Sequence, residues 1–416
     1  MSGAAPRGTE GLSERRAALQ LLDAVLRRGQ TLDSAAQRLA GDDRALALAI
    51  AGETLRRLPE LDALIDGATR LRLADDAKAR MVLRLALAQK LAMNVPDHAL
   101  VATALPLVDG GPRRLVHGVL GTLLRRGLEA SDAPHLPAAV EERWTAAWGD
   151  EVVAAARRAI VRRPPLDLSF ADDAAAQEFA ADNEGVSLVT NHVRLSGGAP
   201  VQLLPGFGEG GWWVQDLAAS LPARLIPRDA ATVLDLCAAP GGKTMQLASR
   251  GHHVTAVDRS ESRLARLSEN LHRTGLEAET MASEAMAWGR GDYDAVLLDA
   301  PCSATGTFRR HPEVLYRAGP RIIADSAVRQ AELLAHAASL LRPGGTLVYA
   351  VCSLELDEGE EIVAAPPAGL AIDPISPDEL PSGIAPHERG WLRVLPGMLE
   401  KEGGLDGFFI ARLVRG

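Results

Sequence analysis

Apolar residues recur at helical spacing through the first third of the chain. From Ser13 to about Gly127 they return every three or four positions, as in RRAALQLLDAVLRRG and DDRALALAIAGETLRRL, the period of a helix that buries one face. Glycine and proline interrupt this pattern often enough to leave room for about half a dozen short helices. We therefore predict an all-helical front domain with breaks at Gly29, Gly41, Pro59, Gly67, Pro96 and the Gly110-Gly111-Pro112 cluster.

The pattern changes after a further helical stretch over residues 137–163. Pro164 and Pro165 follow it, and a double proline forces extended backbone. Beyond them LDLSF alternates like a strand, EFAADNEG is typical of a helix running into a turn, and SLVTNHVRLSG is again extended. These runs predict a small α+β segment.

From Ala231 onward, short β-rich runs alternate with helical segments. The runs are TVLDLC, HHVTAVD, YDAVLLD and TLVYAVCS. Alternating βα units imply a mostly parallel sheet covered on both faces, which is the doubly wound α/β fold class. We therefore expect a flexible tail over residues 1–12, a helical domain over 13–135, linking helices and the α+β segment over 136–225, and the doubly wound domain over 226–416.

Cysteine content and hydropathy indicate the cellular compartment in which the protein works. The three cysteines are Cys237, Cys302 and Cys352, and an odd number without secretory features argues against a disulfide framework. The sequence has no leader-like start and no apolar run long enough to span a bilayer. We expect a cytoplasmic protein with reduced thiols and no membrane partner.

The charge is unevenly distributed. A net charge of −9 speaks against a nucleic-acid partner, because Lys and Arg supply most of the affinity for phosphates. Residues 11–130, however, carry 18 Lys and Arg against 14 Asp and Glu, a balance of +4, which leaves −13 for the remainder. Solvated helix faces explain any single arginine doublet, but the recurrence favours an RNA-facing front domain. The doublets are Arg15-Arg16, Arg27-Arg28, Arg56-Arg57, Arg113-Arg114, Arg125-Arg126, Arg157-Arg158 and Arg162-Arg163.

A glycine-rich turn follows the first strand of the doubly wound domain, in VLDLCAAPGGKTMQLA from Val233 to Ala248. Such a turn lets the backbone approach a ligand and directs helix N–H groups toward an anion. A Walker A loop needs glycine where Cys237 stands, and the dinucleotide motif G-x-G-x-x-G is absent. A purely structural turn remains the alternative.

A carboxylate ends the next strand, in HVTAVDRSESRLARL. Asp258 lies about fifteen residues after the turn, where doubly wound folds commonly hold a ribose diol. An Asp that only caps the following helix is the alternative, and the spacing behind the turn favours the ligand role.

Two further strands end in chemically active residues. YDAVLLDAPCSATGTFRRHPE places Asp299, Pro301 and Cys302 at a strand end, and TLVYAVCSLELDEGEE places Cys352 at another. Ligands of open α/β sheets bind at this edge. A lone cysteine is usually a small buried hydrophobe, but two at one edge point to thiol chemistry. Zinc is disfavoured because no C-x-x-C pair or His stands at ligand spacing, and no metal is expected.

These segments, above all CAAPGGKT and DAPCSATG, resemble the motifs of the nucleolar-protein/Sun family of RNA 5-methylcytosine methyltransferases. The front domain is similar to the NusB-type RNA-binding fold. The resemblance covers nearly the whole chain and includes GFGEGGWWVQDLAASL and GGLDGFFIARL. It implies a Rossmann-like class I methyltransferase that uses S-adenosylmethionine to methylate carbon 5 of a cytosine in RNA, with 16S ribosomal RNA as the expected substrate. We expect a monomer.

The resemblance also implies roles for single residues. The turn would surround the methionine and sulfonium end of the cofactor, Asp258 would hold the ribose with Arg263 nearby, and Glu284 stands where the family usually has an Asp near the adenine. Asp299 would contact the cytosine edge, Cys352 would be the nucleophile, and Cys302 would help release the product. Val351 replaces a common Thr before the nucleophile, and Lys243 either reaches the cofactor carboxylate or pairs with a site Asp. The expected turn residues are Cys237, Ala238, Ala239, Pro240, Gly241, Gly242 and Lys243.

Three other functions are weighed against this one. The same chemistry on another RNA, such as transfer RNA, stays open. An RNA-binding assembly or antitermination factor without activity would lack cofactor affinity, which a titration with S-adenosylmethionine would reveal. A DNA cytosine methyltransferase is disfavoured, because it would carry its nucleophile in the Pro-Cys element and would not need Cys352 as well.

Overall fold

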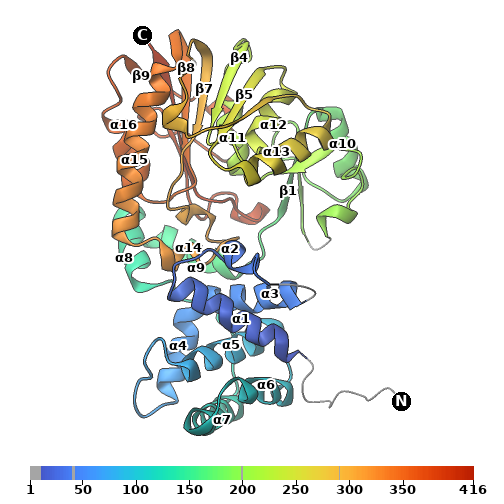
Figure 1. The fold of residues 1–416 in the computed structure, drawn as a ribbon, viewed down its shortest axis with the longest axis vertical. Coiled ribbons are helices and arrows are strands. Elements are labelled where there is room, and N and C mark those ends of the chain that lie inside the picture. The colour runs from blue at the N-terminus through green and yellow to red at the C-terminus, as the bar shows by residue number, and fades with distance from the viewer. Residues whose placement is uncertain (1–10, 40–42, 198–199, 290) are drawn as a thin grey trace. The chain divides into compact units, whose positions relative to one another are not determined.

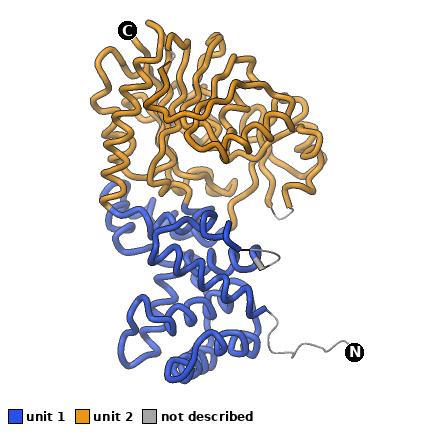
Figure 2. Tube along the Cα trace, viewed as in Figure 1, with its two compact units in different colours: residues 1–162, 308–319 blue, residues 163–307, 320–416 orange. Residues whose placement is uncertain are grey.

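The computed structural model describes residues 11–39, 43–197, 200–289 and 291–416. Most of the tail expected over residues 1–12 and the break expected at Gly41 lie outside these ranges. The chain forms two compact units, one of residues 1–162 and 308–319 and the other of residues 163–307 and 320–416 (Figure 2).

The first unit is helical, which confirms the prediction from apolar spacing. The breaks predicted at Pro59 and at the Gly110-Gly111-Pro112 cluster are confirmed, and each of these prolines lies in the first turn of the helix that begins there. The missing N–H of proline costs nothing there, because the first turn has no internal acceptor for it. The helices are α1 (Leu12–Leu26), α2 (Leu32–Ala36), α3 (Asp43–Arg56), α4 (Leu58–Gly67), α5 (Lys78–Met93), α6 (Asp97–Ala104), the 3-10 turn η1 (Leu105–Leu107), α7 (Gly110–Arg126), α8 (Ala138–Trp148) and α9 (Asp150–Val161).

Helix α5 is the central helix of this unit, and every residue from Ala79 to Gln89 is buried. Two arginines lie among them. Arg80 donates to Asp66 at 2.6 Å, and Arg84 donates to Asp62 at 2.7 Å. Buried charges are tolerated only when they are paired and hydrogen-bonded, so these aspartates on α4 fix how α4 packs on α5.

Residues 308–319 belong to the first unit although they follow Cys302 in sequence. Glu313 accepts the backbone N–H of Leu32 at 3.1 Å, and the Tyr316 hydroxyl donates to the carbonyl of Leu55 at 2.7 Å. The Phe308 ring lies 5.6 Å from that of Trp144, centroid to centroid. The chain therefore leaves the second unit after Thr307, forms α14 (Val314–Arg317) in the first, and returns at Pro320.

The second unit begins with a small antiparallel sheet in the order β2-β1-β3. Its strands are β1 (Leu166–Phe170), β2 (His192–Leu195) and β3 (Trp212–Val214), with α10 (Asp173–Asp182) between the first two. The predicted LDLSF strand is confirmed, as are the helix and the extended run after it. β3 was not predicted, because WWV is too short to show an alternation.

The main sheet has eight strands, and its path runs β10-β11-β8-β7-β4-β5-β6, with β9 paired to β11. The five strands from β8 to β6 are parallel, and β11 is antiparallel to β8. All four predicted runs are strands, so the doubly wound class is confirmed. The bounds are β4 (Thr232–Leu236), β5 (His253–Asp258), β6 (Glu279–Ala282), β7 (Tyr293–Asp299), β8 (Leu341–Val351), β9 (Leu370–Ile372), β10 (Leu392–Val394) and β11 (Phe408–Arg415).

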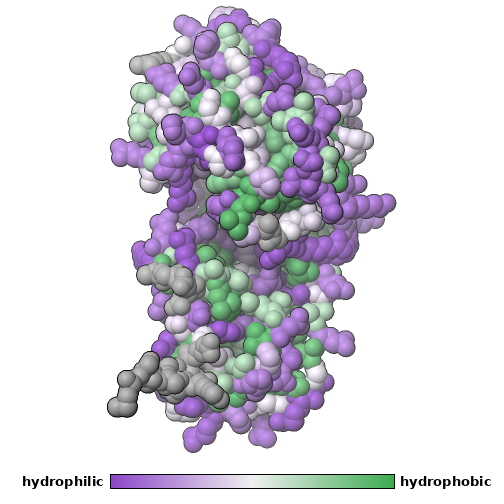
Figure 3. All heavy atoms as spheres, turned by 90° about the vertical axis from the view of Figure 1, so that its right-hand side faces the viewer, coloured by the Kyte–Doolittle hydropathy of each residue, from purple (hydrophilic) through white to green (hydrophobic). Residues whose placement is uncertain are grey.

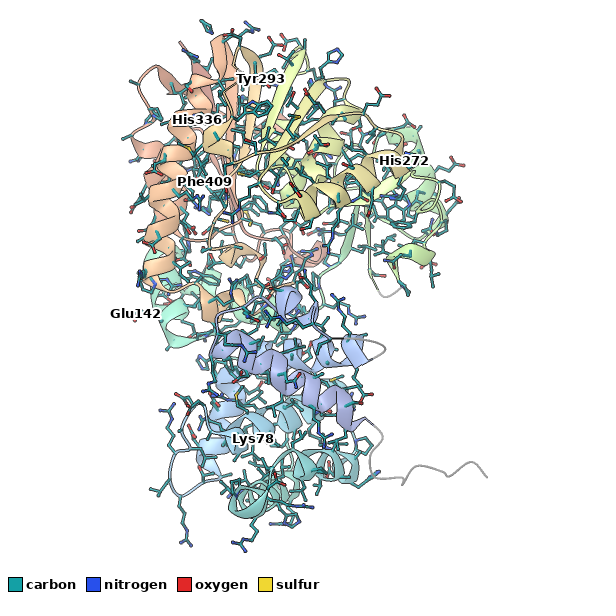
Figure 4. All side chains as sticks on the ribbon, viewed as in Figure 1. Lys78, Glu142, His272, Tyr293, His336 and Phe409 are labelled. Atoms are coloured by element: carbon teal, nitrogen blue, oxygen red, sulfur yellow. The ribbon has the colours of Figure 1, made fainter. Side chains whose placement is uncertain are left out.

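Both faces of this sheet are buried, as a doubly wound fold requires. Alternate strand residues enter two cores: Leu297 packs on one face with α11 (Leu217–Arg224), and Leu298 packs on the other with α15 (Pro320–Ser339). Helices α12 (Gly242–Ser249) and α13 (Glu261–Thr274) pack together in a smaller core (Figure 1). Phe409 of β11, labelled in Figure 4, lies 6.2 Å from the Tyr349 ring.

No helix among the described residues is long and apolar enough to cross a membrane. The face drawn in Figure 3 shows hydrophilic and hydrophobic residues intermixed.

Candidate active site

The parallel strands bring the predicted site residues to one edge. Asp258 and Asp299 are the last residues of β5 and β7, while Cys237 follows β4 and Cys352 follows β8 directly. Because β5, β4, β7 and β8 are neighbours that run in the same direction, their carboxyl ends meet, and this edge is where such folds bind ligands.

The glycine-rich turn after β4 has a shape that only glycine permits at Gly241. Its φ is +103°, and a Cβ there would lie 2.0 Å from Cδ1 of Leu267 on α13. The turn is also tied to β5: Ala238 donates to the Val257 carbonyl at 3.1 Å, and Ala239 donates to Asp258 at 3.2 Å. Its backbone can therefore approach a ligand without a side chain intervening.

Asp258 organises the side of the site next to this turn. Its carboxylate is buried and accepts the N–H of Ser260 at 2.9 Å as well as that of Ala239. Arg263 lies 3.6 Å from the carboxylate and also contacts the Ala239 carbonyl. The sequence predicted both residues as cofactor-binding, and the structure places them together.

A pocket opens beside Asp258. Its lining includes five residues singled out in the sequence, Cys237, Asp258, Arg263, Glu284 and Pro301. Sequence reasoning missed six others, Val257, Arg259, Ala285, Met286, Arg329 and Leu333. Arg329 lies on α15, 3.8 Å from Glu284. Arg329 and Leu333 had no signal in the sequence, because the apolar spacing of α15 identifies a buried face and not what that face covers.

Burial shifts the pKa of two groups at the carboxyl end of β4, Asp235 and Cys237. It raises the pKa of Asp235 to about 7, although the Thr244 hydroxyl donates to this carboxyl at 2.6 Å and acts in the opposite direction. It raises the pKa of Cys237 to about 12, with the charges of nearby aspartates adding to the effect. Cys237 therefore stays a thiol and is no candidate for the nucleophile.

Lys243 and Asp299 form an ion pair at 2.8 Å. Burial would lower the pKa of Lys243, but the charge of Asp299 and its hydrogen bond outweigh it and raise that pKa. A negative charge on Cys352 would act in the same direction. Of the two roles open for Lys243, pairing with a site Asp is the one present in the structure.

The two cysteines meet although they are 50 residues apart in sequence. Their sulfur atoms lie 3.5 Å apart, well beyond the disulfide bond length of about 2.05 Å, and both thiols are free and half-buried. The hydrogen bond with Cys352, with burial second, raises the pKa of Cys302 well above its ordinary value. Cys302 therefore keeps its proton next to Cys352.

Sequence reasoning also missed Glu358. It lies in the acidic run LELDEGEE, which predicted only an acidic helix, yet it is fully buried. An acidic run in the sequence does not show which of its carboxylates turns inward.

Among the described residues, no group of three or more His, Cys, Asp or Glu side chains gathers in a way that could hold a metal ion.

The doubly wound sheet with a pocket at the carboxyl ends of its strands places the second unit in the Rossmann-like class. A family model described as 16S rRNA methyltransferase RsmB/F matches residues 222–414, a NusB family model matches residues 12–125, and relatives named ribosomal RNA small subunit methyltransferase B match nearly end to end. The chain belongs to the RsmB/F family, with a NusB-type domain in front.

The relatives are similar over almost their whole length. The protein from Klebsiella pneumoniae is 34% identical over 442 residues, covering 98% of this chain and 99% of its own. The protein from Erwinia tasmaniensis is 35% identical over 381 residues, covering 82% and 86%.

Solved structures agree on the fold. A methyltransferase homologue from Pyrococcus horikoshii superposes with a TM-score of 0.56 at 24% identity, covering 71% of this chain and 98% of its own. NSun6 from the same organism gives 0.57 at 18% identity, covering 68% and 98%.

Proposed function

We propose that this protein transfers a methyl group from S-adenosylmethionine to carbon 5 of a cytosine in 16S ribosomal RNA. The observation that carries the proposal is the pair of thiols, 3.5 Å apart, at the strand edge that also holds the Lys243–Asp299 ion pair. Family membership and the names of the relatives support ribosomal RNA as the substrate.

The residues of the edge fit the cofactor. The turn from Cys237 to Lys243 has no side chain at Gly241 or Gly242 and would receive the methionine end. Asp258 would accept the ribose hydroxyls, and the pocket wall with Glu284 and Arg329 would face the adenine. Bound S-adenosylmethionine supplies an electrophilic methyl group on a sulfonium.

Cys352 would act as the nucleophile. Carbon 5 of cytosine reacts poorly by itself, so the Cys352 thiolate adds to carbon 6, an S–C bond forms, and the electron pair of the 5,6 double bond moves to carbon 5. Asp299, held by Lys243, would bind the polar edge of the base.

Cys302 would act after methylation. A base must then remove the proton from carbon 5, its C–H electron pair re-forms the double bond, and the S–C6 bond breaks to return the Cys352 thiolate. Cys302 lies beside that sulfur and, as a protonated thiol, would donate a hydrogen bond to the departing Cys352 thiolate. Both ring carbons must be exposed for these steps, so the target would lie in a loop or be flipped out.

The first unit would bind the RNA backbone. Its NusB-type helices include α7, where Arg113, Arg114, Arg125 and Arg126 are exposed.

We further propose that the protein works as a monomer in the cytoplasm and needs no metal ion. The reaction above uses only thiols, a carboxylate and an ammonium group.

The test is mapping of 5-methylcytosine in 16S ribosomal RNA incubated with the protein and S-adenosylmethionine. We expect one modified cytosine, its loss in Cys352→Ala, and a trapped covalent RNA adduct in Cys302→Ala. Methylation of transfer RNA in place of 16S ribosomal RNA would overturn the assignment of 16S ribosomal RNA as the substrate. No methylation of either RNA, and no cofactor binding in an equilibrium titration, would favour the inactive binding factor instead.

A further inference from the structure

A single buried carboxylate spans the two loops that carry the site cysteines. Glu358 lies in the 3-10 turn η5 (Leu356–Glu358) and is fully buried. Its Oε1 accepts the backbone N–H of Ser303 at 2.8 Å, and its Oε2 contacts the hydroxyls of both Ser303 and Ser353. Ser303 directly follows Cys302, and Ser353 directly follows Cys352.

Neighbouring groups complete the connection. The two serine hydroxyl oxygens lie 3.2 Å apart, and Gln330 of α15 donates both to Glu358 at 3.2 Å and to the carbonyl of Pro301 at 2.9 Å. The Tyr349 hydroxyl donates to the backbone carbonyl of Glu358 at 2.7 Å. The loop after β7, strand β8 with its following loop, and helix α15 thus all supply groups around this one residue.

A carboxylate away from water is costly unless hydrogen bonds satisfy it. The donors that contact the Glu358 carboxylate are neutral groups, and they come from both cysteine loops as well as from α15. Separating the loops would take donors from a buried charge. The carboxylate therefore opposes any movement that parts the two sulfur atoms.

We propose that Glu358 is a positioning residue whose carboxylate holds the loops after β7 and β8 together, so that Cys352 and Cys302 reach one base at the same time. The inference rests on the proposed function, in which Cys352 adds to carbon 6 and Cys302 assists its release from the same carbon. Two thiols that take part in breaking one S–C bond must stay close to each other, and the sulfur separation of 3.5 Å satisfies this.

The charge of Glu358 helps to keep Cys302 protonated, so that the two thiols can have different roles. After the hydrogen bond with Cys352 and burial, the charges of Cys352 and Glu358 add to the raised pKa of Cys302. Removal of that negative charge would make Cys302 easier to ionise.

The test compares Glu358→Gln with Asp357→Asn in the full-length protein. Both substitutions remove one negative charge from η5, but Asp357 is exposed. Three quantities are measured: kcat for RNA methylation, the Kd for S-adenosylmethionine, and the rate of Cys302–Cys352 disulfide formation with diamide. Diamide oxidises the two thiols and is itself reduced to the hydrazine. Alkylation of each cysteine by iodoacetamide gives its own reactivity and normalises the disulfide rate.

We expect Glu358→Gln to lower kcat by roughly 100-fold, the effect of misplacing a reacting group by about 1 Å. The Kd should stay within about twofold, because Glu358 does not line the cofactor pocket, and the normalised disulfide rate should fall about tenfold or more, as expected when two groups lose their fixed proximity. Asp357→Asn should match the wild type in all three. A wild-type disulfide rate in Glu358→Gln would overturn the proposal, even with a low kcat.

The disulfide rate separates this proposal from the proposed function. If the wild type methylates no RNA, the assigned reaction fails, yet the disulfide rate still measures the positioning. Should Glu358→Gln not fold by circular dichroism, Ser303→Ala and Ser353→Ala take its place, because each removes one hydroxyl contact and keeps the backbone N–H bond to the carboxylate. Wild-type disulfide rates in both would overturn the proposal equally.

Discussion

Asp235 carries a protonation equilibrium close to neutral pH at the end of β4. Burial raises its pKa to about 7 in the folded protein, whereas an Asp in an unfolded chain titrates near 3.9. From about pH 4 to pH 7 the unfolded chain loses this proton and the folded protein keeps it, so stability falls as the pH rises through that range.

Asp235→Asn removes this dependence, because an amide cannot ionise. We expect the variant to gain stability relative to the wild type between pH 5 and pH 8, by about 2 kcal/mol. Urea denaturation at the two pH values measures this, with the exposed Asp229→Asn as the matched control. If the difference between Asp235→Asn and wild type were the same at both pH values, Asp235 would be ionised throughout.

At the residue scale, the sequence predicts the reactive residues at the ends of the strands but not the buried residue that contacts their loops. Asp258, Asp299, Cys302 and Cys352 stand next to apolar runs, so their positions follow from the parallel sheet. Glu358 has no comparable context, because it turns inward from an acidic run. Only the loop contacts of the folded chain distinguish it from its exposed neighbour Asp357.

At the scale of elements, the small sheet depends on one buried ionic cluster. Asp167 of β1 accepts two hydrogen bonds from Arg194 of β2, each at 2.7 Å, and the N–H of Leu217 at the start of α11 at 2.9 Å. Burial would raise the pKa of Asp167, but hydrogen bonds from Arg194 and His192 outweigh it and hold that pKa far below its usual range.

Asp167→Asn would leave the Arg194 charge buried without its partner. We expect a loss of about 3 kcal/mol in the free energy of unfolding, the usual cost of breaking a buried pair. The loss should be full above about pH 4 and shrink as the pH falls toward the low folded-state pKa, because acid protonates the wild-type carboxyl as well. Urea denaturation at pH 7 and pH 3 checks this, with the exposed Glu178→Gln of α10 as the control. An equal loss at both pH values would point to packing rather than charge.

The elements themselves were predictable where they are long or strongly patterned. The helices of the first unit and the strands β4, β5, β7 and β8 follow from period and β-branched content. Strands β3, β9 and β10 have three residues each. They form strands because a neighbouring strand supplies hydrogen bonds, and the local sequence does not show which segment that neighbour is.

At the scale of the whole molecule, the division into units departs from the order of the sequence. Residues 308–319 extend the Cys302 motif and gave no sign of leaving the second unit, yet they pack among helices of the first. Deletion of the front domain would therefore remove partners of Glu313 and Tyr316. Its contribution to RNA binding is better tested by substitutions in the intact chain.

The arginine doublets differ in how far acidic partners neutralise them. Arg27 and Arg28 pair with Asp23, and Arg57 pairs with Glu60. Among the described residues, the four arginines of α7 form no ion pair, and all four are exposed. They are therefore the strongest candidates for phosphate contacts, since binding needs no prior loss of an ion pair.

We expect substitution of Arg113, Arg114, Arg125 and Arg126 by Gln to weaken RNA binding and to flatten its salt dependence. Each lost contact with single-stranded RNA should reduce the slope of log K against log salt by about 0.7, so the full set should reduce it by roughly 2 to 3. Arg321→Gln, a single exposed charge on α15, is the control and should leave the slope within the error of one contact. The Kd for S-adenosylmethionine should not change, because the cofactor pocket consists of residues of the second unit. An unchanged slope in the fourfold variant would show that α7 does not meet the phosphate backbone, and the RNA-binding face of the first unit would then have to be sought on other helices.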